Sequence, residues 1–117
     1  MILTFDAGAV RRFWLAEYVP EMLEAEARRY PALEGEVTPV PIPSDCEDGF
    51  IEAFYGRPEA LLDPEIRRSQ SAWAFGETAA GLARLRTDLE SGAWDARHGH
   101  LRTQPFFHGS LRLVVDR

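Results

Sequence analysis

The chain has 117 residues and a formal net charge of −6, from 13 basic and 19 acidic side chains. This length is typical of a single domain or fragment spanning residues 1–117, and a hydrophobic content of 45% excludes a wholly disordered chain. The acidic balance excludes nucleic acid as an expected partner, and no apolar run approaches the roughly 18 residues that a membrane-spanning helix needs.

Cysteine usage and the N-terminal residues favour a cytoplasmic protein. Cys46 is the only cysteine, so the chain cannot close an intramolecular disulfide. The first residues contain neither the basic region nor the apolar stretch of a secretory signal peptide. Because a lone thiol is most compatible with reducing conditions, we expect a cytoplasmic location.

A strand followed by two helices is predicted in the first third of the chain. Residues 2–5 are apolar and partly β-branched, which is typical of a buried strand. Asp6 is placed to cap a helix, and apolar residues then recur at helical spacing as far as Met22. Pro20 falls inside this pattern, so we expect it to break the first helix and open a second one, which ends before Pro31.

The middle of the chain is predicted to hold an edge strand, a polar loop and short helices. Residues 36–43 alternate Val and Ile with prolines, which lack the backbone donor, so this strand is irregular or lies at an edge. Residues 44–49 form the polar loop, and residues 50–55 form a short amphipathic helical turn. The Asp-Pro pair at residues 63–64 is typical of a helix start, and the helix is expected to reach about Phe75.

The C-terminal third is predicted to hold two helical segments and the last strand. A helix is expected over residues 77–90 and a further turn over residues 94–98. Phe106 and Phe107 are expected in a partly exposed loop, and residues 111–115 form the strand. Three strands with four or five helices inserted between them predict an α/β fold with a small sheet.

The loop after the edge strand is the densest group of chemically active side chains. It contains Asp45, Cys46 and Asp48, and α/β proteins place many ligand-binding residues in loops at strand ends. The alternative is a polar turn whose side chains bond the local backbone. Cys46 as a nucleophile would need a nearby histidine and an orienting group. Both interpretations stay open on the sequence alone.

Metal and nucleotide motifs are absent from the sequence. His98, His100 and His108 do not have the spacing of a structural zinc site, and paired cysteines are missing, so we expect no metal. No two glycines have the G-x-G spacing of a dinucleotide loop. Residues 76–81 have the G-x₄-G spacing, but the Lys and Ser/Thr of a P-loop do not follow. We therefore predict no cofactor-binding residues in this chain.

Five segments of the chain, residues 2–6, 12–21, 40–50, 55–64 and 111–115, carry one resemblance. Together they resemble the C-terminal half of a class I S-adenosylmethionine-dependent methyltransferase of the small-molecule, type 11-like group. Residues 2–6 resemble the fifth strand of that sheet, and residues 12–21 resemble the helical segment after it. Residues 40–50 are similar to its sixth strand and following loop, and residues 55–64 to the helical insertion after that loop. Residues 111–115 resemble the final strand. The resemblance covers nearly the whole chain.

The resemblance implies a partial Rossmann-like sheet of about three strands, mixed, with the last strand antiparallel. It implies S-adenosylmethionine as the cofactor, although the glycine-rich loop and the ribose-binding acid of the family lie on strands that precede this region. Asp45 is the residue that would act as a base if the acceptor must lose a proton. The residues that the resemblance places around a small-molecule acceptor are Asp6, Phe13, Trp14, Tyr18, Asp45, Cys46 and Asp48.

This comparison predicts the acceptor-binding, C-terminal portion of a truncated or split methyltransferase, inactive without its cofactor-binding half. Its partner would be a second copy or a separately encoded N-terminal half, joined through the edge strand Ile2–Phe5. The main alternative is a non-catalytic binding or dimerisation module. A third interpretation is a small acid–base enzyme that uses Asp45 and a histidine. Ser44 stands where the family has a histidine, which weakens an acid–base role there.

Overall fold

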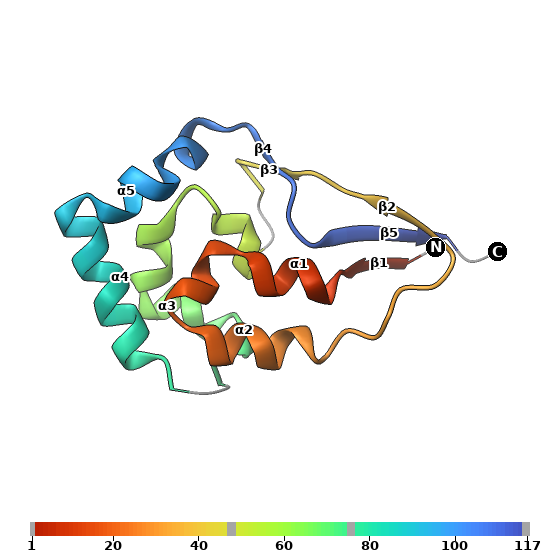
Figure 1. The fold of residues 1–117 in the computed structure, drawn as a ribbon, viewed down its shortest axis with the longest axis horizontal. Helices are drawn as coiled ribbons and strands as arrows, with labels where there is room; N and C mark the ends of the chain where they lie inside the picture. Colours follow the sequence, from red (N-terminus) through yellow and green to blue (C-terminus); the bar gives the residue numbers. More distant parts are fainter. Residues whose placement is uncertain (1, 47–48, 75–76, 116–117) are drawn as a thin grey trace.

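A small sheet and a helical body lie at opposite ends of the molecule (Figure 1). The structure is a computed structural model that describes residues 2–46, 49–74 and 77–115. The molecule is elongated, with extents of 49 × 31 × 23 Å. The three-stranded sheet forms the narrow end, where the chain also begins and ends, and the helices gather at the other end.

The main sheet has three strands in the order β1-β5-β2, formed by Ile2–Phe5, Leu111–Val115 and Glu36–Pro39. The central strand β5 runs antiparallel to both neighbours, as predicted for the last strand. A mixed sheet would require a parallel pair, and the described residues form none. The reason is that β1 and β2 run in the same direction but are separated by β5.

A second, two-stranded sheet pairs β3 (Ile42–Pro43) with β4 (Phe106–Phe107). The single irregular strand predicted over residues 36–43 is therefore divided into β2 and β3, with a break at Val40 and Pro41. The loop predicted at residues 106–107 is wrong, because these residues pair with β3. Phe106 is nevertheless 50% exposed, which confirms the predicted partial exposure.

The first helix is capped as predicted, but it ends at Arg12, before the break that was predicted at Pro20. Asp6 caps α1 (Ala7–Arg12), because its carboxylate accepts the backbone N–H of Ala9 at 3.1 Å. A 3₁₀ turn, η1 (Trp14–Glu17), then leads to α2 (Pro20–Ala27), which has Pro20 in its first turn as predicted.

Short helices fill the middle of the chain: η2 (Ile51–Phe54), η3 (Pro58–Leu62), α3 (Pro64–Arg68) and η4 (Ser71–Ala74). The single helix predicted from residue 64 to about Phe75 is wrong. Ser69 Oγ donates to the carbonyl of Ile66 at 2.8 Å, and this local bond competes with continuation of the helix. Phe75 itself lies outside the described residues.

The C-terminal helices are α4 (Ala79–Ser91), α5 (Ala93–His98) and the 3₁₀ helix η5 (Gly99–Thr103). Gly92 has a φ of 86° between α4 and α5, a left-handed conformation that favours glycine. Within the three described ranges, no helix combines the length and the apolar character that crossing a membrane requires.

The main core lies in the helical body, around Trp14 and Trp94. Their rings meet edge to face with centroids 5.3 Å apart, and the Trp14 indole N–H donates to the backbone carbonyl of Tyr55 at 3.0 Å. These contacts join the N-terminal, middle and C-terminal helices. Other fully buried side chains of this core are Leu15, Val19, Met22, Leu61 and Leu85.

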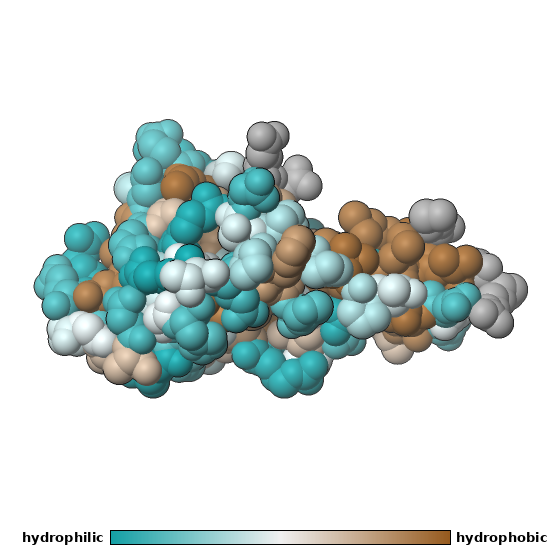
Figure 2. All heavy atoms as spheres, turned by 90° about the horizontal axis from the view of Figure 1, so that it is seen from above, coloured by the Kyte–Doolittle hydropathy of each residue, from teal (hydrophilic) through white to brown (hydrophobic). Residues whose placement is uncertain are grey.

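The sheet is much less covered than the helical body. Ile2 and Leu3 of β1 are 63% and 61% exposed, and Val37 of β2 is 37% exposed. Apolar side chains gather over this end of the molecule, whereas polar side chains dominate the surface of the helical end (Figure 2). A contiguous apolar surface of this kind is typical of an interaction site.

The hydrogen-bond register shows which backbone groups of β1 face away from the sheet. Asp6 donates its backbone N–H to the carbonyl of Ser110 at 2.7 Å, in the same register as β1 and β5. Along an antiparallel strand, successive residues direct their backbone N–H and C=O groups alternately toward the partner strand and away from it. Leu3 and Phe5 therefore direct these groups away from β5. No strand of the described chain lies along that side of β1.

The outer edge of β2 has a different composition. Val40 donates to the carbonyl of Leu111 at 3.0 Å, so the alternation places Pro39 and Val37 with their backbone groups facing outward. Proline has no N–H, and proline at an edge is a common means of preventing further strand pairing. The sheet therefore has one edge interrupted by proline and one edge, β1, without such protection.

Gly81 in α4 provides a test of the helical core. A Cβ at this position would overlap the carbonyl oxygen of Tyr18 and would lie 2.6 Å from Val19 Cγ1. Alanine favours a helix by about 1 kcal/mol over glycine, yet we expect Gly81→Ala to lower the free energy of unfolding by about 1–3 kcal/mol. Urea denaturation would measure this loss.

Thr87→Ala, at an exposed position of the same helix, is the matched control and should leave stability nearly unchanged. A Gly81→Ala protein as stable as the wild type would show that α4 does not contact the Tyr18 backbone as closely as described.

Candidate functional site

Asp6 and Ser110 meet where β1 ends and β5 begins. The Asp6 carboxylate is engaged as the cap of α1, and its Oδ2 lies 3.9 Å from the guanidinium of Arg112. Its backbone N–H is bonded to Ser110. Asp6 therefore has a clear structural role at this end of the sheet.

Phe13, Trp14 and Tyr18, which the sequence analysis places around an acceptor, lie next to one another with most of their surface buried. Their exposed fractions are 3%, 5% and 4%, and the Trp14 ring centroid lies 5.1 Å from Phe13 and 6.3 Å from Tyr18. The Tyr18 hydroxyl donates to Asp88 at 2.6 Å and accepts from Arg97 at 2.6 Å. Burial, followed by the Asp88 bond, raises the pKa of Tyr18, so this hydroxyl stays protonated at neutral pH.

An open groove passes over part of this aromatic group. Phe13 and Trp14 line it together with His98 and Glu17, and its volume is about 530 Å³. The His98 Nε2 lies 2.8 Å from a Glu17 carboxylate oxygen, so the imidazole is oriented by that acid. Because Phe13 and Trp14 are almost fully buried, their rings supply little of the surface of this open groove.

The loop residues Asp45 and Cys46 occupy different environments. Asp45 is exposed. It lies near Tyr55: burial is the main cause that raises the pKa of Tyr55, and the negative charge of Asp45 adds to this rise. Cys46 is half-buried against the core, and its backbone N–H donates to the carbonyl of Pro43 at 3.1 Å. Asp48 lies outside the described residues.

Glu52 is a buried acid that the sequence analysis did not identify. It is only 6% exposed, and its Oε1 accepts the backbone N–H and the hydroxyl of Ser110, at 2.8 and 2.6 Å. Its Oε2 has no hydrogen-bond partner among the described residues. In a 3₁₀ helix, residues three apart share a face, so Glu52 lies on the same side of η2 as the buried Tyr55.

The segment that carries Glu52 is held by Gln70. The Gln70 amide donates to the carbonyl of Gly49 at 2.6 Å and accepts the indole N–H of Trp73 at 2.6 Å. Gln70 is itself buried, so these bonds are shielded from water. These bonds hold Gly49, just before the start of η2, and hence fix the position of Glu52.

Burial raises the pKa of the Glu52 carboxyl above its ordinary value. The cause is desolvation, which outweighs the two hydrogen bonds from Ser110 and the more distant charge of Arg112. Perturbed acids in cavities are frequent at functional sites, although structural networks also produce them.

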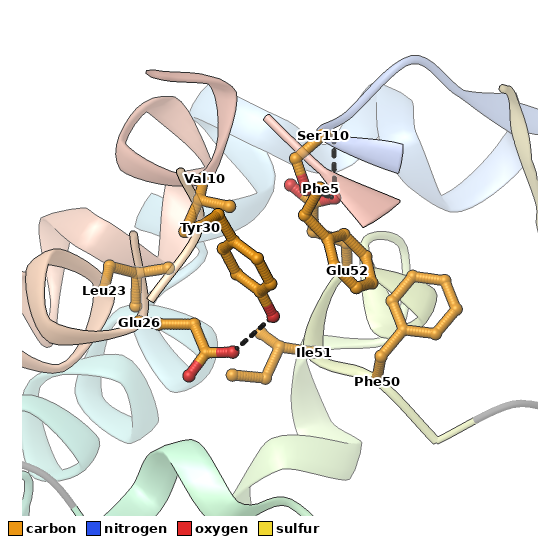
Figure 3. Close-up of a pocket in the computed structure, with 9 residues that line it drawn as sticks. All are labelled: Phe5, Val10, Leu23, Glu26, Tyr30, Phe50, Ile51, Glu52 and Ser110. Carbon is orange, nitrogen blue, oxygen red and sulfur yellow. Dashed lines mark hydrogen bonds between the residues drawn. The ribbon is translucent and has the colours of Figure 1, made fainter. Parts of the chain in front are cut away.

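Glu52 lines a small cavity between β1, α1, α2 and η2 (Figure 3). The cavity has a volume of about 70 Å³. Figure 3 shows Tyr30 bonded to Glu26 on one side and Glu52 bonded to Ser110 on the other. The other residues that line it are Phe5, Val10, Leu23, Phe50 and Ile51.

Comparisons with known proteins give one informative relationship. No protein-family model and no curated protein matches the chain. The chain is similar to a crystal structure from Anabaena variabilis ATCC 29413, described as a "putative methyltransferase from antibiotic biosynthesis pathway". The two share 28% sequence identity with a TM-score of 0.80, over 94% of this chain and 51% of the other. The chain therefore has a methyltransferase fold and spans about half the length of the protein it matches.

The raised pKa of Glu52 makes stability depend on pH. Glu52→Gln keeps the oxygen that accepts both Ser110 bonds and removes the ionisable group. Because the folded-state pKa is raised, wild-type stability falls as the pH rises from the ordinary value of 4.5 through the folded-state value. We expect the Gln variant to lose less free energy of unfolding over that interval in urea titrations at a series of pH values.

The control is Glu21→Gln, which removes an exposed acid of α2. The difference in the free energy of unfolding between Glu21→Gln and the wild type should not grow as the pH rises over this interval. A difference between Glu52→Gln and the wild type that stays constant with pH would contradict burial as the dominant influence on Glu52.

Proposed function

We propose that this chain is the acceptor-side, C-terminal portion of a class I S-adenosylmethionine-dependent methyltransferase. The observation that carries the proposal is the match over 94% of this chain and 51% of the Anabaena variabilis protein, with a TM-score of 0.80. The strand order β1-β5-β2, with β5 antiparallel, supports a partial Rossmann-like sheet.

The cofactor contacts would come from outside this chain. The sequence has no G-x-G loop, so we infer that S-adenosylmethionine is held by an N-terminal half and that this chain alone is inactive. Methyl transfer from a sulfonium donor depends mainly on positioning the acceptor in a desolvated pocket. The groove that Phe13 and Trp14 help to line is the proposed place for the acceptor.

Asp45 is the proposed base for an acceptor that must lose a proton. Its carboxylate is exposed in the loop after β3, whereas the Asp6 carboxylate is occupied by the α1 cap. Cys46 and Asp48 belong to the same loop and are proposed to shape the acceptor site with it.

The outer edge of β1 is the proposed junction with the cofactor-binding half. It directs the backbone groups of Leu3 and Phe5 outward, and its exposed Ile2 and Leu3 side chains offer apolar surface. The proline at the opposite edge makes β2 a poorer site for pairing. In the isolated chain, the same edge would pair with a second copy. A non-catalytic dimerisation module is therefore the alternative function that this observation favours.

Cofactor binding tests the proposed division of the enzyme. We expect calorimetry to detect no binding of S-adenosylmethionine or S-adenosylhomocysteine to the isolated chain. A fusion that adds the part of the Anabaena variabilis protein outside the alignment, placed before β1, should bind both with micromolar affinity. Micromolar binding by the isolated chain would contradict the absence of a cofactor site. A folded fusion that does not bind would contradict the methyltransferase assignment.

Proline substitution tests the edge strand. Leu3→Pro removes an outward N–H and keeps the β1–β5 hydrogen bonds. We expect the wild-type chain to self-associate at high concentration in sedimentation experiments and Leu3→Pro to remain monomeric. Val37→Pro makes the same change at the outer edge of β2 and should associate like the wild type. A wild-type chain that is monomeric at all concentrations would contradict pairing through β1.

A further inference from the structure

We propose that a depression beside the start of β5 binds the carboxylate group of a small organic acid. The side chains that would hold the carboxylate are Arg12, His108 and Arg112, which line this depression together. As a statement about the methyl acceptor, the inference rests on the function proposed above. Carboxylate binding itself does not depend on that function and can be measured on this chain alone.

Arg112 is held in place by the backbone, while part of its guanidinium stays free. Its side chain is only 16% exposed, and its Nη1 donates to the carbonyls of Gly109 and Leu111 at 2.7 and 3.0 Å. Its Nε and Nη2 donate to no described residue, and Asp6 Oδ2, at 3.9 Å from Nη2, is too far for a hydrogen bond. A fixed guanidinium with free donors is preorganised for a planar carboxylate.

The free donors of Arg112 are reachable from solvent. Among the half-buried and buried residues that the structure describes, the side-chain N and O atoms that are both enclosed and without a hydrogen-bond partner are Glu52 Oε2 and Trp94 Nε1. The Nε and Nη2 of Arg112 have no partner and are not among these enclosed atoms. They therefore keep accessible surface, and a ligand can bond to them without displacing a protein group.

Arg12 supplies a second guanidinium. The side chain is exposed, and no acceptor bonds to it within the described part of the chain. A Cβ at Gly8 would lie 3.2 Å from Arg12 Nη1 and 3.6 Å from Asp6 Oδ2, so the Arg12 guanidinium extends back along α1 toward Asp6. Arg112 approaches the same carboxylate. The neighbouring Arg11 differs, because its charge is already paired with Glu24 at 2.6 Å.

The charges at the depression favour an anion with a single negative charge. The Asp6 carboxylate offsets one of the two guanidinium charges. Glu52 also lines the depression, but its Oε1 accepts from Ser110, and burial raises the pKa of this carboxyl, which favours its neutral form. The imidazole of His108 adds an N–H donor. The charge of one guanidinium remains, which matches a carboxylate better than the about 1.5–2 negative charges of a phosphate group.

The depression lies where α/β proteins bind their ligands. Arg112 pairs with Thr4 of β1 and with Pro39 of β2, close to the carboxyl ends of both strands. This end of the sheet faces the helical body (Figure 1). Ligands of α/β proteins bind beyond the carboxyl ends of the strands, so the position agrees with a binding site.

The size of the depression limits what it can hold. Its volume is about 140 Å³, below the roughly 300 Å³ at which pockets for drug-sized molecules begin. It therefore suits one end of a molecule. Arg12, Phe13 and Phe107 line both the depression and the groove proposed for the acceptor. An acceptor in that groove can thus place its carboxylate in the depression.

The experiment is a titration of the full chain with sodium propionate, followed by NMR shifts of the Gly109 amide and of the Arg12 and Arg112 side chains. Propionamide, a neutral molecule of similar shape, and sodium chloride at equal ionic strength are the ligand controls. Inorganic phosphate tests the alternative anion. We expect saturable shifts with propionate at millimolar concentrations, because a ligand with so few atoms gains little binding energy.

Variants test the two arginines separately. Arg12→Gln should weaken propionate binding about tenfold or more, because it removes a charge-assisted contact, and it breaks no bond between described residues. Arg112→Lys keeps the charge but loses the forked donors, and should weaken binding as well. Arg86→Gln is the matched control, since it removes an exposed arginine of α4, at the other end of the molecule, and should leave propionate binding unchanged.

Saturable propionate shifts that propionamide and chloride do not reproduce, and that Arg12→Gln weakens, would support the proposal. Four results would overturn it: no saturable shifts, equal binding of propionamide, tighter binding of phosphate, or unchanged affinity in Arg12→Gln. The ligand comparison uses the wild-type protein, so it holds even where a variant fails to fold. The titration contains no S-adenosylmethionine, so a negative result here would leave the proposed methyltransferase function standing, and a fusion without cofactor binding would leave the carboxylate site standing.

Discussion

The hydrogen bonds of Ser110 connect the parts of the molecule on which the sheet and the cavity depend. Its N–H and hydroxyl both donate to Glu52 of η2, and its carbonyl accepts the N–H of Asp6 between β1 and α1. Ser110 is 1% exposed, so all three bonds lie in a low-dielectric environment where losing a partner is costly. One buried residue at the start of β5 thereby fixes the register of β1 and the position of a buried acid.

The helical body and the sheet bury their apolar side chains to different degrees. Trp14 joins three parts of the chain through Trp94 and Tyr55, and the helices close around it with little apolar surface left exposed. The sheet has no such cover, and its strands expose Ile2 and Leu3. The exposed apolar side chains of the described strands are therefore concentrated at the sheet end, as in surfaces that serve for interaction.

The sequence predicted elements whose signals are local, and it missed those that depend on contacts between distant residues. Asp6 as a cap and Pro20 as a helix start follow from one or two residues, and both predictions are confirmed. Pairing of Phe106–Phe107 with Ile42–Pro43 joins segments more than sixty residues apart and has no local signal. Glu52 was missed because a charged residue in a short amphipathic turn is expected at the surface, whereas the bond from Ser110, 58 residues along the chain, holds it in the interior.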